Sequence, residues 1–167
     1  MHGTATASTT FAPLAEKHLD GAATLLAARH AAARLVEPSL DPRYEDPATA
    51  RREISGLLGR DGASGVAAAQ AGEVLGSAVG CAIELSSIHR SLTLPAGAGF
   101  LGFAAVLRQH RGLGAGRLLG EAVLHWACEA GYPAVVTDWR MTNLLSSRTW
   151  PRLGFRPTFY RLFRAIA

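Results

Sequence analysis

The strongest chemical signal in the sequence is a run of seven residues, 111–117, which reads RGLGAGR. An apolar segment, 99–107, precedes it, and apolar residues spaced three and four apart follow it, which predicts an amphipathic helix. The run, called here the glycine turn, therefore lies between a buried strand and a helix N-terminus, where N–H groups lack intrahelical partners and the helix dipole is positive. With Arg111 and Arg117 at its ends, it is predicted to bind phosphate.

The glycine turn fits two common phosphate motifs poorly. A Walker loop needs a lysine after its last glycine, and the only lysine in the chain is Lys17. A dinucleotide fingerprint needs three glycines: Gly112 and Gly114 fit, but the third position is Arg117. Asp138 imitates the ribose-binding acid of that fold, so a dinucleotide-binding domain stays open as an alternative.

A third pattern, Arg/Gln-x-x-Gly-x-Gly/Ala, is met by Arg111, Gly114 and Gly116. A second match follows at Asn143 and at residues 150–155, which read WPRLGF. In both, the sequence resembles the GCN5-related N-acetyltransferases (GNAT), which hold the pyrophosphate of acetyl-CoA on this turn and carry an Asn followed by an aromatic residue and Leu-Gly-Phe. The clear resemblance covers roughly residues 99–164.

The resemblance implies an α/β (α+β) fold of the GNAT type. Its sheet is mixed and mostly antiparallel, with helices on both faces and a central pair of parallel strands that splay apart. In this sequence the splayed strands would be residues 100–107 and 134–138. The acyl-CoA arm lies in the gap between such strands and hydrogen-bonds to strand backbone.

The resemblance also implies the cofactor, acetyl-CoA or another short acyl-CoA, and the residues that would bind it. Three contribute backbone at the end of the strand before the glycine turn; the others are the glycine turn itself and an asparagine. These residues are Ala104, Ala105, Val106, Arg111, Gly112, Leu113, Gly114, Ala115, Gly116, Arg117 and Asn143.

Acetyl transfer needs a base to take the proton of the attacking amine. Asp138, at the end of the short strand, is the first candidate, because some family members carry a glutamate base there; a pair with Arg140 or a turn cap would equally explain it. Glu84, near the end of a sheet strand, is the second candidate. His110 is expected to support the turn or to face solvent.

The general acid departs from the family pattern, because Trp150 occupies the position of the common tyrosine. An indole N–H donates a hydrogen bond but does not give up a proton at physiological pH. The thiolate would then leave unaided, or Tyr160 would serve, and Trp150 would instead line the acyl or pantetheine tunnel. Asn143 has two compatible roles, as a helix cap and as a cofactor contact.

The acceptor would lie against the first two helices and the loop between them. That loop carries Glu37, Asp41, Tyr44, Glu45 and Asp46. Acidic and aromatic groups suit a cationic amine, and a solvated polar loop explains them as well. The sequence predicts a small-molecule or peptide amine without naming it.

Periodicity and breakers predict the remaining elements. Strands are expected at 11–14, 66–70, 74–85 and 155–163, and helices at 19–35, 47–59 and 143–150. A loop is expected at 86–98. Asp46 should cap the second helix, and Pro151 should end the last one. The small residues Gly76, Ala78, Gly80 and Ala82 require close packing on the sheet.

Composition bounds the function classes. The 167 residues suffice for one domain, 11–167, after a loose tail, 1–10. No apolar run is long enough for a bilayer, and the start does not resemble a signal peptide, so a cytoplasmic protein without membrane attachment is expected. The net charge of +4 comes from scattered arginines without interleaved stacking aromatics, which disfavours nucleic acid. Scarce lysine with abundant alanine, arginine and glycine suggests a bacterial source.

The two cysteines, Cys81 and Cys128, fall in predicted core elements and are expected to be buried thiols without a disulfide. No metal-ligand spacing is present. A homodimer through residues 159–167 is one explanation of the apolar end of the chain, and a covered edge within the monomer is another.

The sequence therefore predicts an acetyl-CoA-dependent N-acetyltransferase that works by direct attack of an amine on the thioester. The main alternative is a CoA-binding module without catalysis, a sensor or partner of another protein. It is motivated by the missing tyrosine and by the absence of an acid or base on the strand 100–107.

Overall fold

A five-stranded sheet is the centre of the computed structural model, which describes residues 8–82, 97–140 and 142–158. The strand order is β1-β2-β3-β4-β5. The strands are β1 (Thr10–Pro13), β2 (Ser64–Gln70), β3 (Glu73–Ala82), β4 (Gly99–Val106) and β5 (Val135–Thr137). β1 to β4 pair antiparallel and β5 pairs parallel with β4, so the sheet is mixed as expected.

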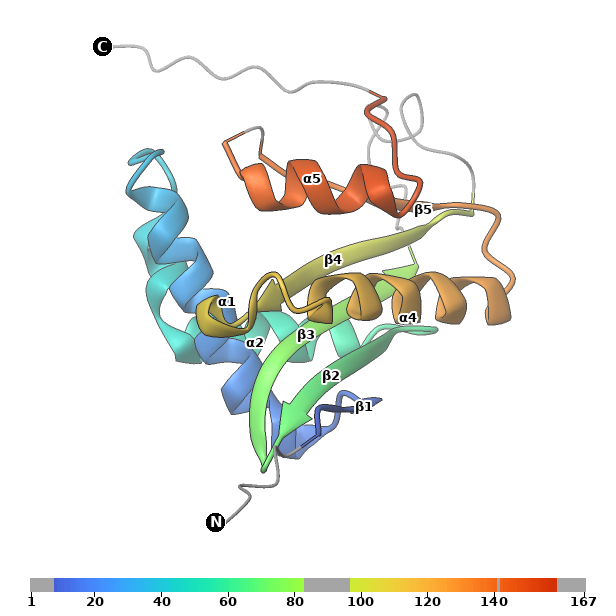
Figure 1. Cartoon of the computed structure of the whole chain (residues 1–167), viewed down its shortest axis with the longest axis horizontal. Helices are drawn as coiled ribbons and strands as arrows, with labels where there is room; N and C mark the ends of the chain where they lie inside the picture. Colours follow the sequence, from blue (N-terminus) through green and yellow to red (C-terminus); the bar gives the residue numbers. More distant parts are fainter. Residues whose placement is uncertain (1–7, 83–96, 141, 159–167) are drawn as a thin grey trace, which may run out of the picture.

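The described ranges contain four α-helices, which cover the two faces of this sheet (Figure 1). They are α1 (Leu19–Arg34), α2 (Pro47–Leu58), α4 (Ala115–Glu129) and α5 (Leu144–Arg152). α1 and α2 share one apolar core with β2 and β3, whereas α4 and α5 share a second core on the opposite face. Short 3-10 turns lie at Glu16–His18, Pro42–Glu45 and Arg108–His110.

The helix boundaries follow local chemistry. Asp46 caps α2 through its side chain, which accepts from the N–H groups of Ala48 and Thr49, and Pro47 occupies the first helical position. Gly131, with φ +75°, follows the end of α4. The predicted end of α5 was wrong: the helix continues through Pro151 to Arg152. A proline is tolerated there because the last turn needs few further i to i−4 bonds.

Small residues on the sheet bring α4 close to it, as the sequence predicted. A Cβ on Gly76 would lie 2.8 Å from Leu119 Cδ1, and one on Gly80 would lie 2.4 Å from the Trp126 ring. Both distances are shorter than packed carbon atoms allow. The glycines of β3 therefore set how closely α4 packs on the sheet.

Two further expectations need correction. Residues 155–158 form no strand, and the rest of the predicted last strand, 159–163, lies outside the described residues, as do Tyr160, the segment 159–167 and the loop 86–96. Cys81 is buried as expected, but Cys128 is exposed, because it falls on the solvent side of α4 opposite Leu119, Val123 and Ala127. No disulfide joins the two.

None of the helices in the described ranges is long and apolar enough to cross a membrane.

Candidate active site

The parallel pair β4 and β5 separates after three residues. Gly99, Phe100 and Leu101 pair with Val135, Val136 and Thr137, and β5 then ends while β4 continues to Val106. Figure 1 shows β4 extending toward α1 past the end of β5. We call the region between residues 102–106 on one side and residues 138–140 and 142–143 on the other the β4–β5 fork. It is the splayed pair that the sequence predicted.

The register of β3 and β4 decides which backbone groups point into the fork. Leu107 N donates to Leu75 O at 2.7 Å, and Ser77 faces Ala105 two residues further along. Because directly opposite residues alternate between bonded and non-bonded pairs, the backbone of Ala105 faces β3. The backbone groups of Ala104 and Val106 face the other way, into the fork.

The glycine turn starts where β4 ends. Gly112 and Gly114 have φ of +80° and +88°, and neither has an atom within 4 Å of an added Cβ. They are glycines because of their backbone conformation, which other residues adopt at a cost. Gly114 is the N-cap of α4 and offers no side chain to cap it.

Backbone donors at this helix end lack acceptors. Arg117 N and Leu118 N both donate to Gly114 O, at 3.0 and 3.1 Å. The N–H groups of Ala115 and Gly116 come earlier, and no backbone acceptor for them is found among the described residues. They point at an exposed surface with the positive end of the helix dipole behind them. This arrangement suits an anion.

Side chains around the turn are also cationic. Arg111 Nε donates to Val106 O at 3.1 Å, which holds its guanidinium over the end of β4. Arg117 instead pairs with Glu121 along α4 at 2.9 Å, with both side chains well exposed. Leu113 is 75% exposed. Of the two predicted arginines, Arg111 is thus the one directed at the fork.

Arg29, which the sequence analysis did not select, lies on α1 and is half-buried. Its pKa is lowered, first by burial and then by the positive charges of Arg140 and Arg111. Arg140, in the segment after β5, and Arg111, on the glycine turn, therefore lie near enough to act on the charge of Arg29. The sequence contained one signal for this placement, the spacing along the helix. Arg29 follows Leu25 by four residues and Leu26 by three, which puts it on the stripe that faces the sheet.

The far side of the fork is formed by the segment from β5 to α5. Asp138 is exposed, and no hydrogen bond or ion pair joins its carboxylate to a described residue. The expected alternative, a pair with Arg140, is therefore not formed. Trp139 Nε1 donates to Ser147 Oγ at 3.2 Å. Glu84, the second candidate base, lies outside the described residues.

Asn143 caps α5 as predicted. Its Oδ1 accepts from Ser146 N at 3.2 Å and its Nδ2 donates to Ser146 Oγ at 2.8 Å, which leaves one amide hydrogen for another partner. Trp150 is only 7% exposed and packs edge-on against Phe155, with ring centroids 5.7 Å apart. Its packing in the core of α4 and α5 accounts for its size and apolar character.

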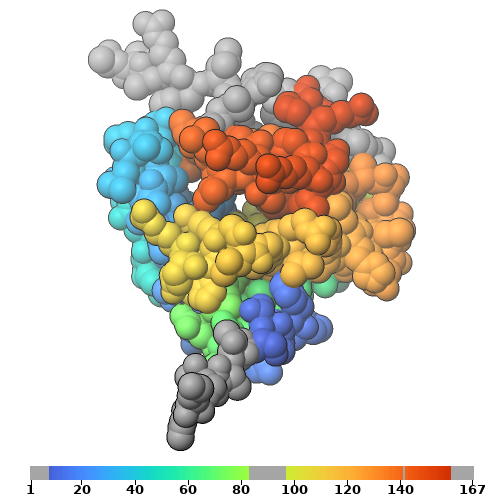
Figure 2. Space-filling model, in the orientation of Figure 1, coloured from blue at the N-terminus to red at the C-terminus, as the bar shows by residue number. Residues whose placement is uncertain are grey.

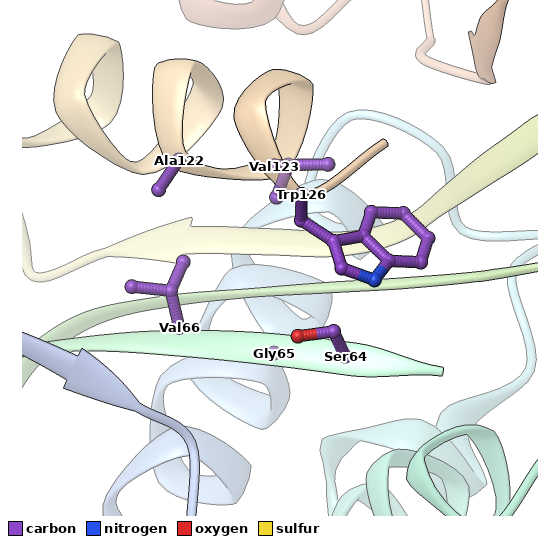
Figure 3. Close-up of a pocket in the computed structure, with 6 residues that line it drawn as sticks. All are labelled: Ser64, Gly65, Val66, Ala122, Val123 and Trp126. Carbon is purple, nitrogen blue, oxygen red and sulfur yellow. The ribbon is translucent and has the colours of Figure 1, made fainter. Parts of the chain in front are cut away.

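The surface is hollowed between α5 and the segment formed by the glycine turn and the start of α4, drawn orange-red and yellow in Figure 2. This hollow lies at the fork. A separate cavity between β2 and α4, lined by Ser64, Val66 and Trp126 among others, has a volume of about 30 Å³ (Figure 3). That volume holds about one water molecule, so this cavity is not a cofactor site.

Another depression, of about 310 Å³, lies between α1 and α2 and is lined by Asp20, Thr24 and Arg51 among others. Arg51 is held there by Asp20, at 2.8 Å, and by Glu16. The described residues contain no group of three or more side chains that could hold a metal ion.

Comparison with known proteins agrees with this geometry. The model of a family described as "Acetyltransferase (GNAT) family" matches residues 28–155. No curated protein matches the chain. Similar solved structures include aminoglycoside N-acetyltransferase AAC(6')-Iy in complex with CoA, with a TM-score of 0.70 and 17% identity over 99% of each chain.

Two further structures have the same fold. Aminoglycoside 6'-N-acetyltransferase AAC(6')-IG from Acinetobacter haemolyticus has a TM-score of 0.68 and 18% identity, covering 95% of this chain and 98% of that one. A protein described as a transcriptional regulator from Bacillus halodurans C-125 has a TM-score of 0.68 and 15% identity, covering 95% and 100%. At these identities the likeness concerns the fold.

Proposed function

The chain belongs to the GNAT acetyltransferase family, and we propose that it transfers the acetyl group of acetyl-CoA to the amine of a small molecule. The observation that carries this proposal is the glycine turn. It presents N–H groups without acceptors, two glycines with positive φ and the Arg111 guanidinium at the open end of the β4–β5 fork.

The residues present fit such a cofactor. A pyrophosphate would accept from the N–H groups of Ala115 and Gly116, and Gly116 leaves room, since an added Cβ there would meet only Val106 Cγ2, at 3.8 Å. Ala104 and Val106 would bind the arm of the cofactor through backbone groups that β3 does not use. Ala105 is omitted from this set because its backbone faces β3. When bound, acetyl-CoA supplies an acyl group activated as a thioester.

The chain contributes a base and a shaped surface. Asp138 would accept a proton from the attacking amine, directly or through water, while the nitrogen–carbon bond forms and the carbon–sulfur bond breaks. Backbone N–H groups of β4 in the fork would face the carbonyl oxygen, where negative charge develops. Asn143 would contribute its remaining amide hydrogen to the cofactor arm.

A side-chain acid has no candidate among the described residues near Trp150. The indole is buried and does not release protons, so the thiolate is expected to leave unaided or to be protonated by water. Thiolates are stable enough for this route, as their ordinary pKa lies near 8.5. Because this route uses no side-chain acid, the pH profile of kcat is expected to show no descending limb near neutrality.

The acceptor class is proposed from the family and its fold. Structures with this fold include enzymes named as aminoglycoside N-acetyltransferases, which supports an amine of a small molecule. A peptide amine is tested in the same panel of acceptors.

Thermal melts with acetyl-CoA, CoA and NAD, followed by a thiol-release assay over an amine panel, test the proposal. Ligand at about one hundred times its dissociation constant stabilises by about 2.7 kcal/mol, a shift of several degrees for a chain of this length. Shifts with both CoA forms and thiol release with an amine are expected. A shift with NAD alone, or CoA binding without thiol release from any amine, would contradict it.

A further inference from the structure

An arginine occupies a position on α1 where an apolar residue is expected. Arg29 lies on the stripe that contains Ala22, Leu25 and Leu26, and this stripe packs on the sheet. The Arg29 side chain is half-buried and makes no hydrogen bond or ion pair with a described residue. Desolvating a charge without a partner costs free energy, so an anion bound to this partly shielded guanidinium would stabilise it.

Two more cations act on Arg29. Its pKa is lowered first by burial and then by the positive charges of Arg140 and Arg111, and no carboxylate among the described residues acts on it in the opposite sense. Arg111 is fixed by its bond to Val106 O. Three positive charges around one opening leave a site that an anion would stabilise.

The cofactor pyrophosphate does not account for all three arginines. The glycine turn and α4 lie on one face of the sheet, whereas α1 lies on the other with α2. Arg111 belongs to the turn and is accounted for by the cofactor. Arg29 belongs to the helix on the opposite face, and the described residues place no strand beside residues 102–106 of β4. An anion on Arg29 therefore approaches from the side that the cofactor turn does not occupy.

We propose that Arg29 and Arg140 bind an anionic group, a carboxylate or phosphate, of the acceptor amine. This inference rests on the proposed function, since it names the acceptor class of the same site. Guanidinium groups bind carboxylates and phosphates through paired N–H donors, and such charge-assisted bonds are strong when partly shielded from water. The same three charges repel a polycationic amine.

The carboxylates of the loop before α2 do not offset this preference. Asp41 is bound by Arg43, Glu45 by Arg34 and Asp46 by the N-terminus of α2. Three of the four carboxylates of this loop are thus engaged, and the fourth, Glu37, accepts a hydrogen bond from the Ser39 hydroxyl. At the fork, Asp138 is assigned as the base, which leaves the guanidinium groups of Arg29 and Arg140 to bind a substituent of the acceptor.

Variants of the two arginines, compared with a control, test the proposal. Arg29→Met keeps an unbranched side chain on the packed stripe, Arg140→Gln removes an exposed charge, and Arg60→Gln removes an exposed charge at the end of α2. Each is assayed with matched acceptors: glycine, L-alanine, L-phenylalanine and L-glutamate against their α-carboxamides, and 2-aminoethyl phosphate against ethanolamine. Acetyl-CoA affinity and the melting temperature are measured alongside.

The parent protein is expected to prefer at least one anionic acceptor over its neutral partner by about tenfold or more in kcat/KM. Arg29→Met and Arg140→Gln should each raise KM for that acceptor by about 10- to 100-fold and remove the preference, with acetyl-CoA affinity within threefold of the parent. Arg60→Gln should change neither the KM for that acceptor nor the preference for it. Arg29→Met should also melt at the same temperature as the parent or higher, which a structural role for Arg29 would not allow.

Other results overturn the inference. Acetyl-CoA affinity that falls as much as acceptor affinity would assign the arginines to a cofactor phosphate. A preference for succinyl-CoA over acetyl-CoA that Arg29→Met abolishes would assign them to the acyl group. A protein that binds acetyl-CoA but prefers no anionic acceptor over its neutral partner overturns the inference while leaving the cofactor site intact, and failure to bind acetyl-CoA contradicts the proposed function itself.

Discussion

Two charged regions of this molecule differ in how their charges are used. In the acidic loop, residues 37–46, Asp41 is bound by Arg43 at 2.6 and 2.8 Å, and Glu45 Oε1 lies 3.0 Å from Arg34 Nε as an ion pair. At the β4–β5 fork, by contrast, neither the side chain of Asp138 nor that of Arg140 makes a hydrogen bond or ion pair with a described residue.

Charges of the first kind stabilise the loop on which they lie. Charges of the second kind have no side-chain partner among the described residues. They are free to bind a ligand, which is why the fork and not the more acidic loop is the proposed site.

The largest effect is expected from the unpaired carboxylate. Asp138→Asn should lower kcat by about 100- to 10,000-fold, because the amide cannot accept the amine proton, while acetyl-CoA affinity stays unchanged. Asp41→Asn, in the acidic loop, is the matched control and should leave kcat unchanged. Steady-state kinetics with a binding titration measure both. Equal losses of rate and affinity in Asp138→Asn, or no loss of rate, would remove the base from this position.

A carboxylate placed on the glycine turn should have the next largest effect. Gly116→Glu adds a negative charge where the pyrophosphate is expected, and like charges in contact cost several kcal/mol, so acetyl-CoA affinity should fall by about 100-fold or more. Gly56→Glu adds the same charge on α2, where an added Cβ also meets no obstacle. Isothermal titration should show normal acetyl-CoA binding by this control. Unchanged binding by Gly116→Glu would mean that the cofactor lies elsewhere.

The glycine turn and α2 also differ in the backbone conformation of their glycines. Gly114→Ala forces a side chain into φ +88° and should destabilise the fold by about 1–2 kcal/mol, seen as a melting temperature lower by several degrees. Gly56→Ala, within α2, should instead stabilise by about 0.5–1 kcal/mol because glycine is unfavourable inside a helix. The two variants are thus expected to shift the melting temperature in opposite directions. A Gly114→Ala protein as stable as the parent would show that the turn adopts another conformation in solution.

The smallest effect concerns a paired charge. The pKa of Asp46 is lowered by hydrogen bonds from the Thr49 hydroxyl and from the N–H groups of Ala48 and Thr49. Since the folded pKa lies below the unfolded value of about 3.9, the cap stabilises above that value, and its contribution is lost as pH falls through the lower folded pKa.

Asp46→Ala should therefore melt below the parent at pH 7, with the difference shrinking below about pH 4. Glu53→Ala, an exposed position on α2, serves as the control and should show no such pH dependence. A difference for Asp46→Ala that is constant down to pH 2 would mean that the charge of Asp46 does not matter for the cap.

The sequence was sufficient for the elements whose signals are local. Residues 99–107 are apolar and are followed by the glycine turn, so β4, the turn and α4 could be predicted from neighbours in the chain. Asp46 before Pro47 was enough to start α2. The end of α5 is marked by Gly154, which has φ +87° directly after the C-cap Leu153, and the prediction missed it because it placed the stop at Pro151.

Features that depend on distant segments could not be predicted. Arg29 on a helix is ordinarily read as exposed, and only the placement of α1 against the end of β4 brings it toward Arg111 and Arg140. Which of residues 104–106 face the fork depends on the register with β3, and that register includes an irregularity between Val79 and Gly80 that no local pattern announces. The exposure of Cys128 likewise depends on how α4 is rotated on the sheet.

The short length of β5 has a consequence for the exchange of backbone hydrogens with solvent. Ala105 N–H lies within the β3–β4 ladder, whereas its neighbours at 104 and 106 face a part of the sheet where the described residues supply no strand. Amide exchange along the end of β4 should therefore alternate from slow to fast residue by residue. Saturation with acetyl-CoA should slow exchange at the fast positions and leave the exchange rate of Ala105 unchanged. The bound arm of the cofactor would then be detected as a substitute for the strand residues that β5 does not provide.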